Sequence, residues 1–133
     1  CIVEVRYPDW LPSLKFMGAV EYGLNALCLE DVHGTLRIER VPQALILGDA
    51  YFDGIDEYTI RVTTEDLATL FHELVHIMQY SLYELEVYQE GNAYWKGEMM
   101  EGLSYEESPW ELEAHHIEKV LLKCFELHRQ KSS

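Results

Sequence analysis

Apolar and polar residues alternate along three stretches in the first half of the chain. These are residues 2–7, 35–41 and 57–62, of which the last (EYTIRV) alternates most cleanly. A period of two predicts strands that bury one face. A short apolar run at 44–47 follows Pro42, which separates it from the second of these strands. We therefore expect a small sheet built mainly from the first sixty residues.

Three other segments space their apolar residues for helices. Their predicted starts are Pro12 and Ser13 for the first, an N-cap at Thr63 or Thr64 for the second, and Pro109 for the third. The second is expected to reach about residue 83 and the third about residue 129.

Two stretches between the last two helices are less regular. The acidic residues 84–90 (ELEVYQE) indicate a solvated helix end, and the aromatic and glycine-rich residues 91–102 a loop or a loose hairpin. Sheet elements, a helix, an irregular stretch and a helix make an α+β fold, a small mixed sheet packed against two helices. At 133 residues the chain is long enough for one domain, residues 1–133, and too short for two.

Composition narrows the class of protein. Hydrophobic residues make up 48% of the chain and aromatic residues 12%, as in folded globular proteins. A net charge of −14 argues against nucleic-acid binding, because the surface would repel phosphates, but it suits a basic peptide or protein partner. No apolar run approaches the ~20 residues of a membrane span, so no membrane association is expected.

The cysteines indicate a reducing environment. Cys1, Cys28 and Cys124 are odd in number, far apart and without C-x-x-C spacing, which argues against a disulfide framework and a cysteine-built zinc site. We expect idle thiols and a cytoplasmic protein, with a virion-associated or secreted protein as alternatives.

One motif indicates specific chemistry. In TLFHELVHIMQ, residues 69–79, His72 and His76 are four residues apart. On a helix these positions differ by about 40° in direction and ~6 Å in height, so both imidazoles can bind one ion. Glu73 lies about 100° further round, where its carboxylate can reach a water on that ion and serve as general base. Zinc is the expected metal.

A chance match has to be weighed against this interpretation. A chain with this many histidines and glutamates contains H-E-x-x-H in roughly one case in thirty. The surroundings favour a site, because the residues beside the motif are apolar: Leu70, Leu74, Val75, Ile77 and Met78. Ionisable groups in such a helix need a partner, and a metal would supply it. A buried hydrogen-bonded histidine pair without metal remains the third alternative.

A catalytic zinc also needs a third protein ligand. Five candidate donors lie in SPWELEAHHIEKV, residues 108–120: Glu111, Glu113, His115, His116 and Glu118. Glu111 and His115 share one helical face, and Glu113 and His116 share another. Spacing alone does not choose among them.

These two motifs together resemble those of small gluzincin-type zincin metallopeptidases. Residues 69–78 are similar to the extended zincin signature, and Tyr105-x-x-x-Pro109-Trp-Glu-x-Glu113-Ala is similar to the second motif of small gluzincins. The resemblance covers about residues 57–120. It implies that the third ligand is the glutamate before alanine, Glu113, with Glu111 as second choice.

The resemblance also implies a fold and further residue roles. The metal would lie in a groove between the two helices, and the edge strand before the motif helix, 57–62 or a neighbour, would align an extended peptide. Tyr105 is the preferred residue to assist by stabilising the oxyanion, with His116 and His128 as alternatives. His115 stands where relatives with a second-shell residue have aspartate or asparagine, a departure from the family pattern.

The leading hypothesis is a zinc-dependent metallopeptidase. His72, His76 and Glu113 would bind the metal, Glu73 would act as base, and the substrate would be a peptide or protein. The alternative is a catalytically weak or inactive zinc-binding or partner-binding domain on the same fold, as in a virion or regulatory protein. A purely structural zinc site needs no base, so Glu73 favours the enzyme.

Overall fold

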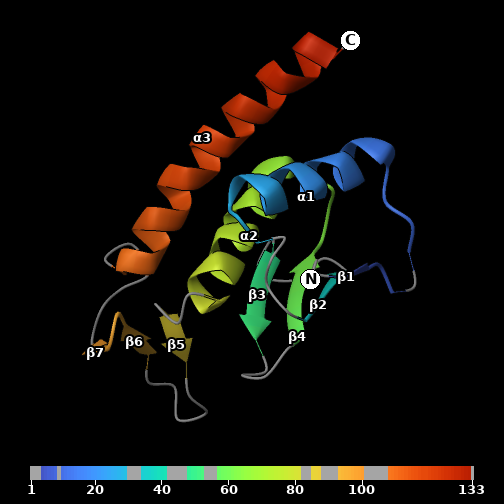
Figure 1. Ribbon diagram of the computed structural model, residues 1–133. Coiled ribbons are helices and arrows are strands. Elements are labelled where there is room, and N and C mark those ends of the chain that lie inside the picture. The colour runs from blue at the N-terminus through green and yellow to red at the C-terminus, as the bar shows by residue number, and fades with distance from the viewer. Residues whose placement is uncertain are drawn as a thin grey trace.

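The computed structural model describes residues 4–8, 10–29, 34–41, 48–52, 57–81, 85–87, 93–100 and 108–132. The helices are α1 (Leu14–Ala26), α2 (Leu67–Ser81) and α3 (Pro109–Ser132). The strands are β1 (Glu4–Arg6), β2 (Thr35–Arg40), β3 (Gly48–Phe52), β4 (Glu57–Val62), β5 (Leu85–Val87), β6 (Ala93–Trp95) and β7 (Glu98–Met100). This confirms the α+β class (Figure 1).

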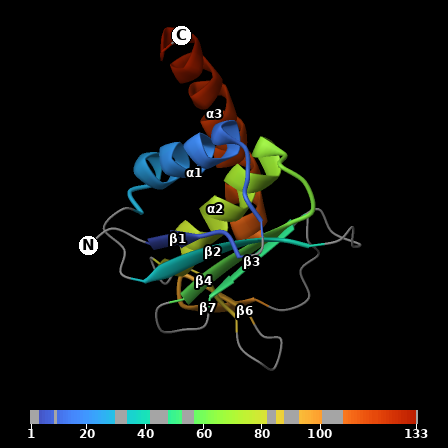
Figure 2. The same cartoon turned by 90° about the vertical axis from the view of Figure 1, so that its right-hand side faces the viewer.

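The larger sheet has the strand order β1-β2-β4-β3. β1, β2 and β4 are parallel, and β3 pairs antiparallel with β4. The three helices lie on one side of this sheet (Figure 2). β4, the most clearly alternating strand, is therefore central and not an edge; its neighbour β3 is the edge strand beside it. Buried residues follow one another at Tyr58, Thr59 and Ile60, as expected where both faces of a strand are covered.

Helix α2 lies at the centre of the molecule. It packs against α1, α3, β3 and β4, and every residue from Leu70 to Ile77 is buried. A helix that is surrounded on all sides has no solvent-facing stripe, so its polar residues must find partners inside the protein. The two histidines and the glutamate of the motif are therefore interior side chains.

Helices α1 and α3 start at the predicted residues, and α2 starts at a different one. Ser13 caps α1 by accepting a hydrogen bond from the Phe16 amide at 3.2 Å, and Pro109 opens α3, as predicted. The N-cap of α2 is Asp66, not Thr63 or Thr64. Its carboxylate accepts from the backbone N–H of Thr69 at 3.1 Å and from the hydroxyl of that residue at 2.8 Å. One carboxylate thus satisfies two donors, which a threonine further upstream would not reach.

The irregular region contains a second, antiparallel sheet in the order β5-β6-β7. The predicted loose hairpin is confirmed as β6 and β7, joined at Lys96 (φ 52°) and Gly97 (φ 86°). Positive φ at both positions is what a tight hairpin turn requires. The prediction of a helix end at 84–90 is wrong where residues are described, because β5 pairs with β6. Pairing with β6 makes this segment a strand, and such pairing cannot be read from the local sequence.

The described part of the chain includes two of the three cysteines and three helices, which can be compared with the predicted lack of disulfides and of membrane spans. Cys28 and Cys124 are free, exposed thiols. None of the described helices combines the length and apolar character needed to cross a membrane. The apolar run at 44–47 lies outside the described residues.

Two glycines of α1 allow a matched test of packing. An added Cβ at Gly23 would lie 2.6 Å from Cδ1 of the buried Leu74, whereas one at Gly18 would meet nothing within 4 Å. Alanine in place of a helical glycine gains about 1 kcal/mol, and overpacking a core costs about 1–3 kcal/mol. Urea unfolding should therefore show Gly18→Ala stabilised by about 1 kcal/mol and Gly23→Ala destabilised by about 1 kcal/mol. Equal effects at the two positions would contradict the close approach of α1 to α2.

Candidate metal centre

Both histidines of the motif meet one carboxylate of α3. The Nε2 atom of His72 lies 2.9 Å from Oε1 of Glu111, and the Nε2 atom of His76 lies 3.2 Å from the same oxygen. The two rings are roughly perpendicular, with centroids 4.8 Å apart. Side chains four residues apart on α2 thus converge on a point between α2 and α3, which the helical spacing predicts.

The ring orientation of His76 is fixed by a buried amide. The Gln79 side chain is fully buried, and its Nε2 donates to the Trp110 carbonyl at 2.9 Å and to Glu113 at 3.1 Å. Both partners are acceptors, so the amide oxygen must be the atom that lies 2.8 Å from Nδ1 of His76. This oxygen can only accept, so Nδ1 carries the proton. Nε2 of the neutral ring therefore presents a lone pair.

His72 is oriented by a carboxylate. Its Nδ1 donates to Oε1 of Glu118 at 2.9 Å, about two helical turns beyond Glu111 on α3. A carboxylate on the far nitrogen sets the tautomer of an imidazole and raises its basicity, as it does for many metal-bound histidines. The neutral ring of His72 therefore also presents a lone pair at Nε2.

Three electron-pair donors thus converge: the two Nε2 atoms and Oε1 of Glu111. With neutral rings no hydrogen stands between them, so their close approach requires a cation, either protons on the rings or a metal ion. Ligand atoms of a tetrahedral zinc with bonds of about 2.0–2.1 Å lie about 3.3 Å apart. The observed 2.9 and 3.2 Å are just inside that separation. The donor set fits zinc in atom type, and these two nitrogen–oxygen separations are compatible with a shared ion.

The residue that the resemblance indicates first as third ligand, Glu113, lies elsewhere. Its carboxylate bonds to Gln79 and not to an imidazole. The structure brings Glu111, the second choice, to both rings instead. The physical reason is helical phase, because positions two apart on α3 point in directions that differ by about 200°.

Of the other candidate ligands and assisting residues, one lies next to the imidazoles and the others do not or are not described. His115 is half-exposed, yet its ring centroid lies 4.5 Å from that of His72, and donor atoms of His72, Glu111 and His115 fall within 4.8 Å of one another. His116 is exposed, and His128 packs beside Tyr22, away from this cluster. Tyr105, the predicted assisting residue, lies outside the described residues, so its role stays a prediction.

Glu73 is buried next to the two histidines. One donor atom each of His72, Glu73 and His76 lies within 4.8 Å of the others, so the carboxylate reaches the same space as the imidazoles. Burial raises the pKa of Glu73 to about 7, although the charges of His76 and His72 partly oppose this rise. A carboxyl group with such a pKa can both accept and release a proton near neutral pH.

The two histidines and Glu111 shift one another's pKa values. Burial alone would lower the pKa of His72 and of His76, but their hydrogen bonds to Glu111 outweigh this, so both pKa values lie above the ordinary value of 6.5. Burial would raise the pKa of Glu111, but the two histidines hold it well below its ordinary value. Glu111 therefore stays ionised and attracts a cation between itself and the rings.

Sequence reasoning did not single out Tyr80 or Gln79. Burial, with the neighbouring charges of Glu73, Glu111 and Asp49, raises the pKa of Tyr80 to about 12, so its hydroxyl stays neutral and close to these carboxylates. Tyr80 is seven residues after Glu73, and Gln79 is three after His76. Both spacings place a side chain on the same helical face, and that signal could have identified them.

Comparisons with protein-family models, with curated proteins and with solved structures found no match. The site's function must therefore be inferred from its own chemistry.

Proposed function

We propose that this protein is a zinc-dependent metallopeptidase whose metal is held by His72, His76 and Glu111. The observation that carries the proposal is the meeting of both Nε2 lone pairs with one carboxylate oxygen, in a buried place where each ring is fixed by a partner on its other nitrogen. Catalytic zinc sites use three protein ligands of these types and leave a position open. Glu73 beside the ligands supplies the base that such a site needs.

Each residue has a distinct task in this proposal. Zinc bound to the three ligands would supply an acidified water and polarise the scissile carbonyl. Glu73, next to the two imidazoles, would be the group that accepts a proton and later releases it to the leaving amine, and its raised pKa suits a side chain that does both. Gln79 and Glu118 hold the two imidazoles with Nε2 toward the metal position.

The sheet edge next to the site suggests the substrate class. β3 is an edge strand of the larger sheet and packs against α2, the helix of the motif. An extended peptide could pair with the side of β3 on which the described residues form no strand, and so pass the metal position. The net charge of −14 favours peptides with basic residues. We therefore propose extended, basic peptide segments as substrates.

One observation favours the second candidate, a zinc-binding domain without turnover. His115 offers a nitrogen close to His72 and Glu111, and with His76 these would make four protein ligands. Zinc sites closed by four protein ligands are structural, because no position remains for water or substrate. The number of ligands therefore separates the two candidates.

Metal content and coordination test the proposal. Protein purified without chelator should contain about one zinc ion per chain, and metal-free protein that gains no stability from zinc would rule out the site. Cobalt substitution then counts the ligands by its visible spectrum. If the site is open, His115→Ala should leave the cobalt spectrum unchanged, whereas a changed spectrum would favour the closed, non-catalytic site.

The stabilising effect of zinc should depend steeply on pH. The raised pKa values of His72 and His76 mean that, without metal, their ion pairs with Glu111 stabilise the fold at low pH and are lost as pH rises through those values. Zinc needs the unprotonated rings, so its effect has the opposite sign. The zinc-induced rise in Tm should be absent near pH ~5 and grow above the ordinary histidine pKa of about 6.5. A rise in Tm that is equal throughout this range would contradict binding by the imidazoles.

A further inference from the structure

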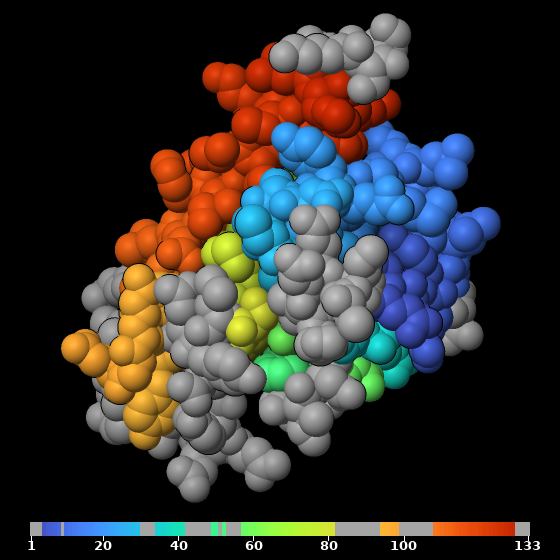
Figure 3. Space-filling view, in the orientation of Figure 1, coloured from blue at the N-terminus to red at the C-terminus, as the bar shows by residue number. Residues whose placement is uncertain are grey.

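A groove separates α1 from the C-terminal half of α3, on a part of the molecule that the metal proposal does not use. Its volume is about 570 Å³, within the range of small-molecule and side-chain binding sites. Figure 3 shows α1 next to the red end of α3 on one face. From Glu118 to Arg129 the helix rises about 16 Å, so the groove is distant from the imidazoles.

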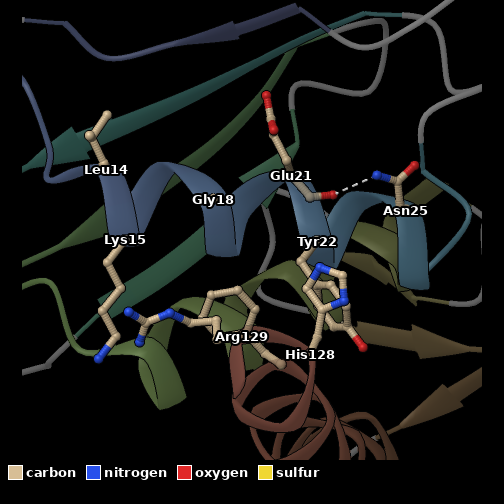
Figure 4. A pocket seen from close by; sticks show the side chains of 9 residues that line it. Leu14, Lys15, Gly18, Glu21, Tyr22, Asn25, His128 and Arg129 are labelled. Carbon is tan, nitrogen blue, oxygen red and sulfur yellow. Dashed lines mark hydrogen bonds between the residues drawn. The ribbon is translucent and has the colours of Figure 1, made fainter. Parts of the chain in front are cut away.

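The groove carries two cations on its rim. Lys15 from α1 and Arg129 from α3 extend toward the same side of the groove (Figure 4). Arg6, Arg37 and Arg61 have carboxylate partners, but none of the described carboxylates forms an ion pair with Lys15 or Arg129. In a chain with 24 acidic and 10 basic residues, two neighbouring cations without a carboxylate are an unusual local excess of positive charge.

The nearest acidic side chain of α1 does not neutralise them. Glu21 belongs to the groove lining, but its carboxylate points to the opposite side of α1 from Lys15 and Arg129 (Figure 4). Burial and, to a smaller extent, the charge of Glu21 raise the pKa of Tyr7 to about 12, and Tyr7 is not among the residues that line the groove. The positive charge of the groove is therefore available to a ligand.

Beside the two cations, aromatic side chains line the groove. Tyr22 and Phe125 pack with ring centroids 5.4 Å apart, and the guanidinium of Arg129 lies 5.9 Å from the centre of the Phe125 ring. An apolar surface beside two cations suits a ligand that joins an apolar group to negative charge.

Gly18 forms part of the groove and has no packing reason to be glycine. A Cβ at Gly18 would meet nothing within 4 Å, unlike one at Gly23, and glycine inside a helix costs about 1 kcal/mol. Among the described residues, no close contact at Gly18 explains why a glycine should stand there despite this cost. A side chain here would, however, fill the space between Lys15 and Tyr22 that a ligand would enter.

We propose that the groove of α1 and α3 docks an acidic peptide segment of a partner protein, with an apolar side chain against Gly18, Tyr22 and Phe125 and carboxylates between Lys15 and Arg129. Charge complementarity selects this occupant: the groove is positive on a protein of strongly negative net charge, so a basic segment would be drawn elsewhere on the surface. The site is independent of the proposed metal and peptidase activity.

Selection of peptides tests this docking. Random short peptides displayed on phage are selected on the full chain, and the best is labelled for fluorescence anisotropy. We expect peptides rich in Asp and Glu with a large apolar residue, whose affinity falls at higher salt. Gly18→Leu should weaken binding about tenfold or more by filling the groove, and the pair Lys15→Glu and Arg129→Glu should do the same by reversing its charge.

A charge-matched control makes the result specific. Lys119→Glu with Lys123→Glu changes the net charge equally at exposed positions of α3 that do not line the groove, and should leave the affinity nearly unchanged. Equal weakening by both charge pairs, insensitivity to Gly18→Leu, or selection of peptides without acidic residues would overturn the proposal. So would a wild-type dimer that Gly18→Leu dissociates, because a second copy would then occupy the groove.

Discussion

Replacing Glu111 with glutamine should abolish tight zinc binding, while the same change at Glu113 should weaken it only modestly. Glu111 is the carboxylate that reaches both imidazoles, whereas Glu113 acts through the Gln79 amide. One ligand of three carries roughly 4 kcal/mol of a typical zinc affinity, about a thousandfold in Kd. Loss of an outer partner costs about tenfold to a hundredfold. Competition with a chromophoric chelator measures both.

The two variants are well matched as a pair. Both variants remove one negative charge from the same turn of α3, so they change the net charge of the protein equally. Unfolding of each variant in the presence of a chelator separates lost binding from lost fold. If Glu113→Gln proved the more damaging of the two, the ligand implied by the family resemblance would be right and the side-chain arrangement of the structure would not.

Glu73→Gln should remove peptidase activity and keep the metal. The amide occupies the same buried space but cannot accept a proton, and the loss of a general base costs about 100-fold to 10,000-fold in kcat. Zinc affinity should change far less than in Glu111→Gln, because Glu73 is not one of the proposed ligands. Digestion of a peptide library, followed by mass spectrometry, measures the first effect, and chelator competition the second.

The pH profile provides an independent check on Glu73. Its pKa is raised to about 7, so the carboxylate form needed to accept a proton increases through neutral pH. A zinc ion beside Glu73 would lower this pKa, so activity at saturating zinc should rise with pH over a range below ~7 on account of this group. A library digest that is identical for wild type and Glu73→Gln would defeat catalysis and leave metal binding intact.

The approach of Glu111, and not Glu113, to the imidazoles could have been predicted from the sequence. Ala114, Leu121 and Phe125 are buried residues of α3 at spacings that keep them on one face. Extending that face one turn toward the N-terminus reaches Glu111 and leaves Glu113 on another side of the helix. The positions of the apolar residues of α3 therefore indicate Glu111, whereas the family resemblance indicated Glu113.

Other features could not be read from local patterns. The strict alternation of β4 predicted a strand but not its central place, because strand order depends on partners far along the chain. β5 is a short acidic stretch that pairs with β6 only through tertiary contacts. By contrast, Ser13, Pro109 and the His72–His76 spacing depend on helical geometry alone, and each of these was found where predicted.

The bonds between α2 and α3 give the helix pair a further property. Glu111, Glu113 and Glu118 all point from α3 to the imidazoles or the amide of α2. Glu111 and Glu118 both contact His72, so their negative charges would repel one another if the histidines were neutral and no cation were bound. If zinc binds as proposed, occupancy of the site and the packing of α3 against α2 should therefore form one coupled equilibrium.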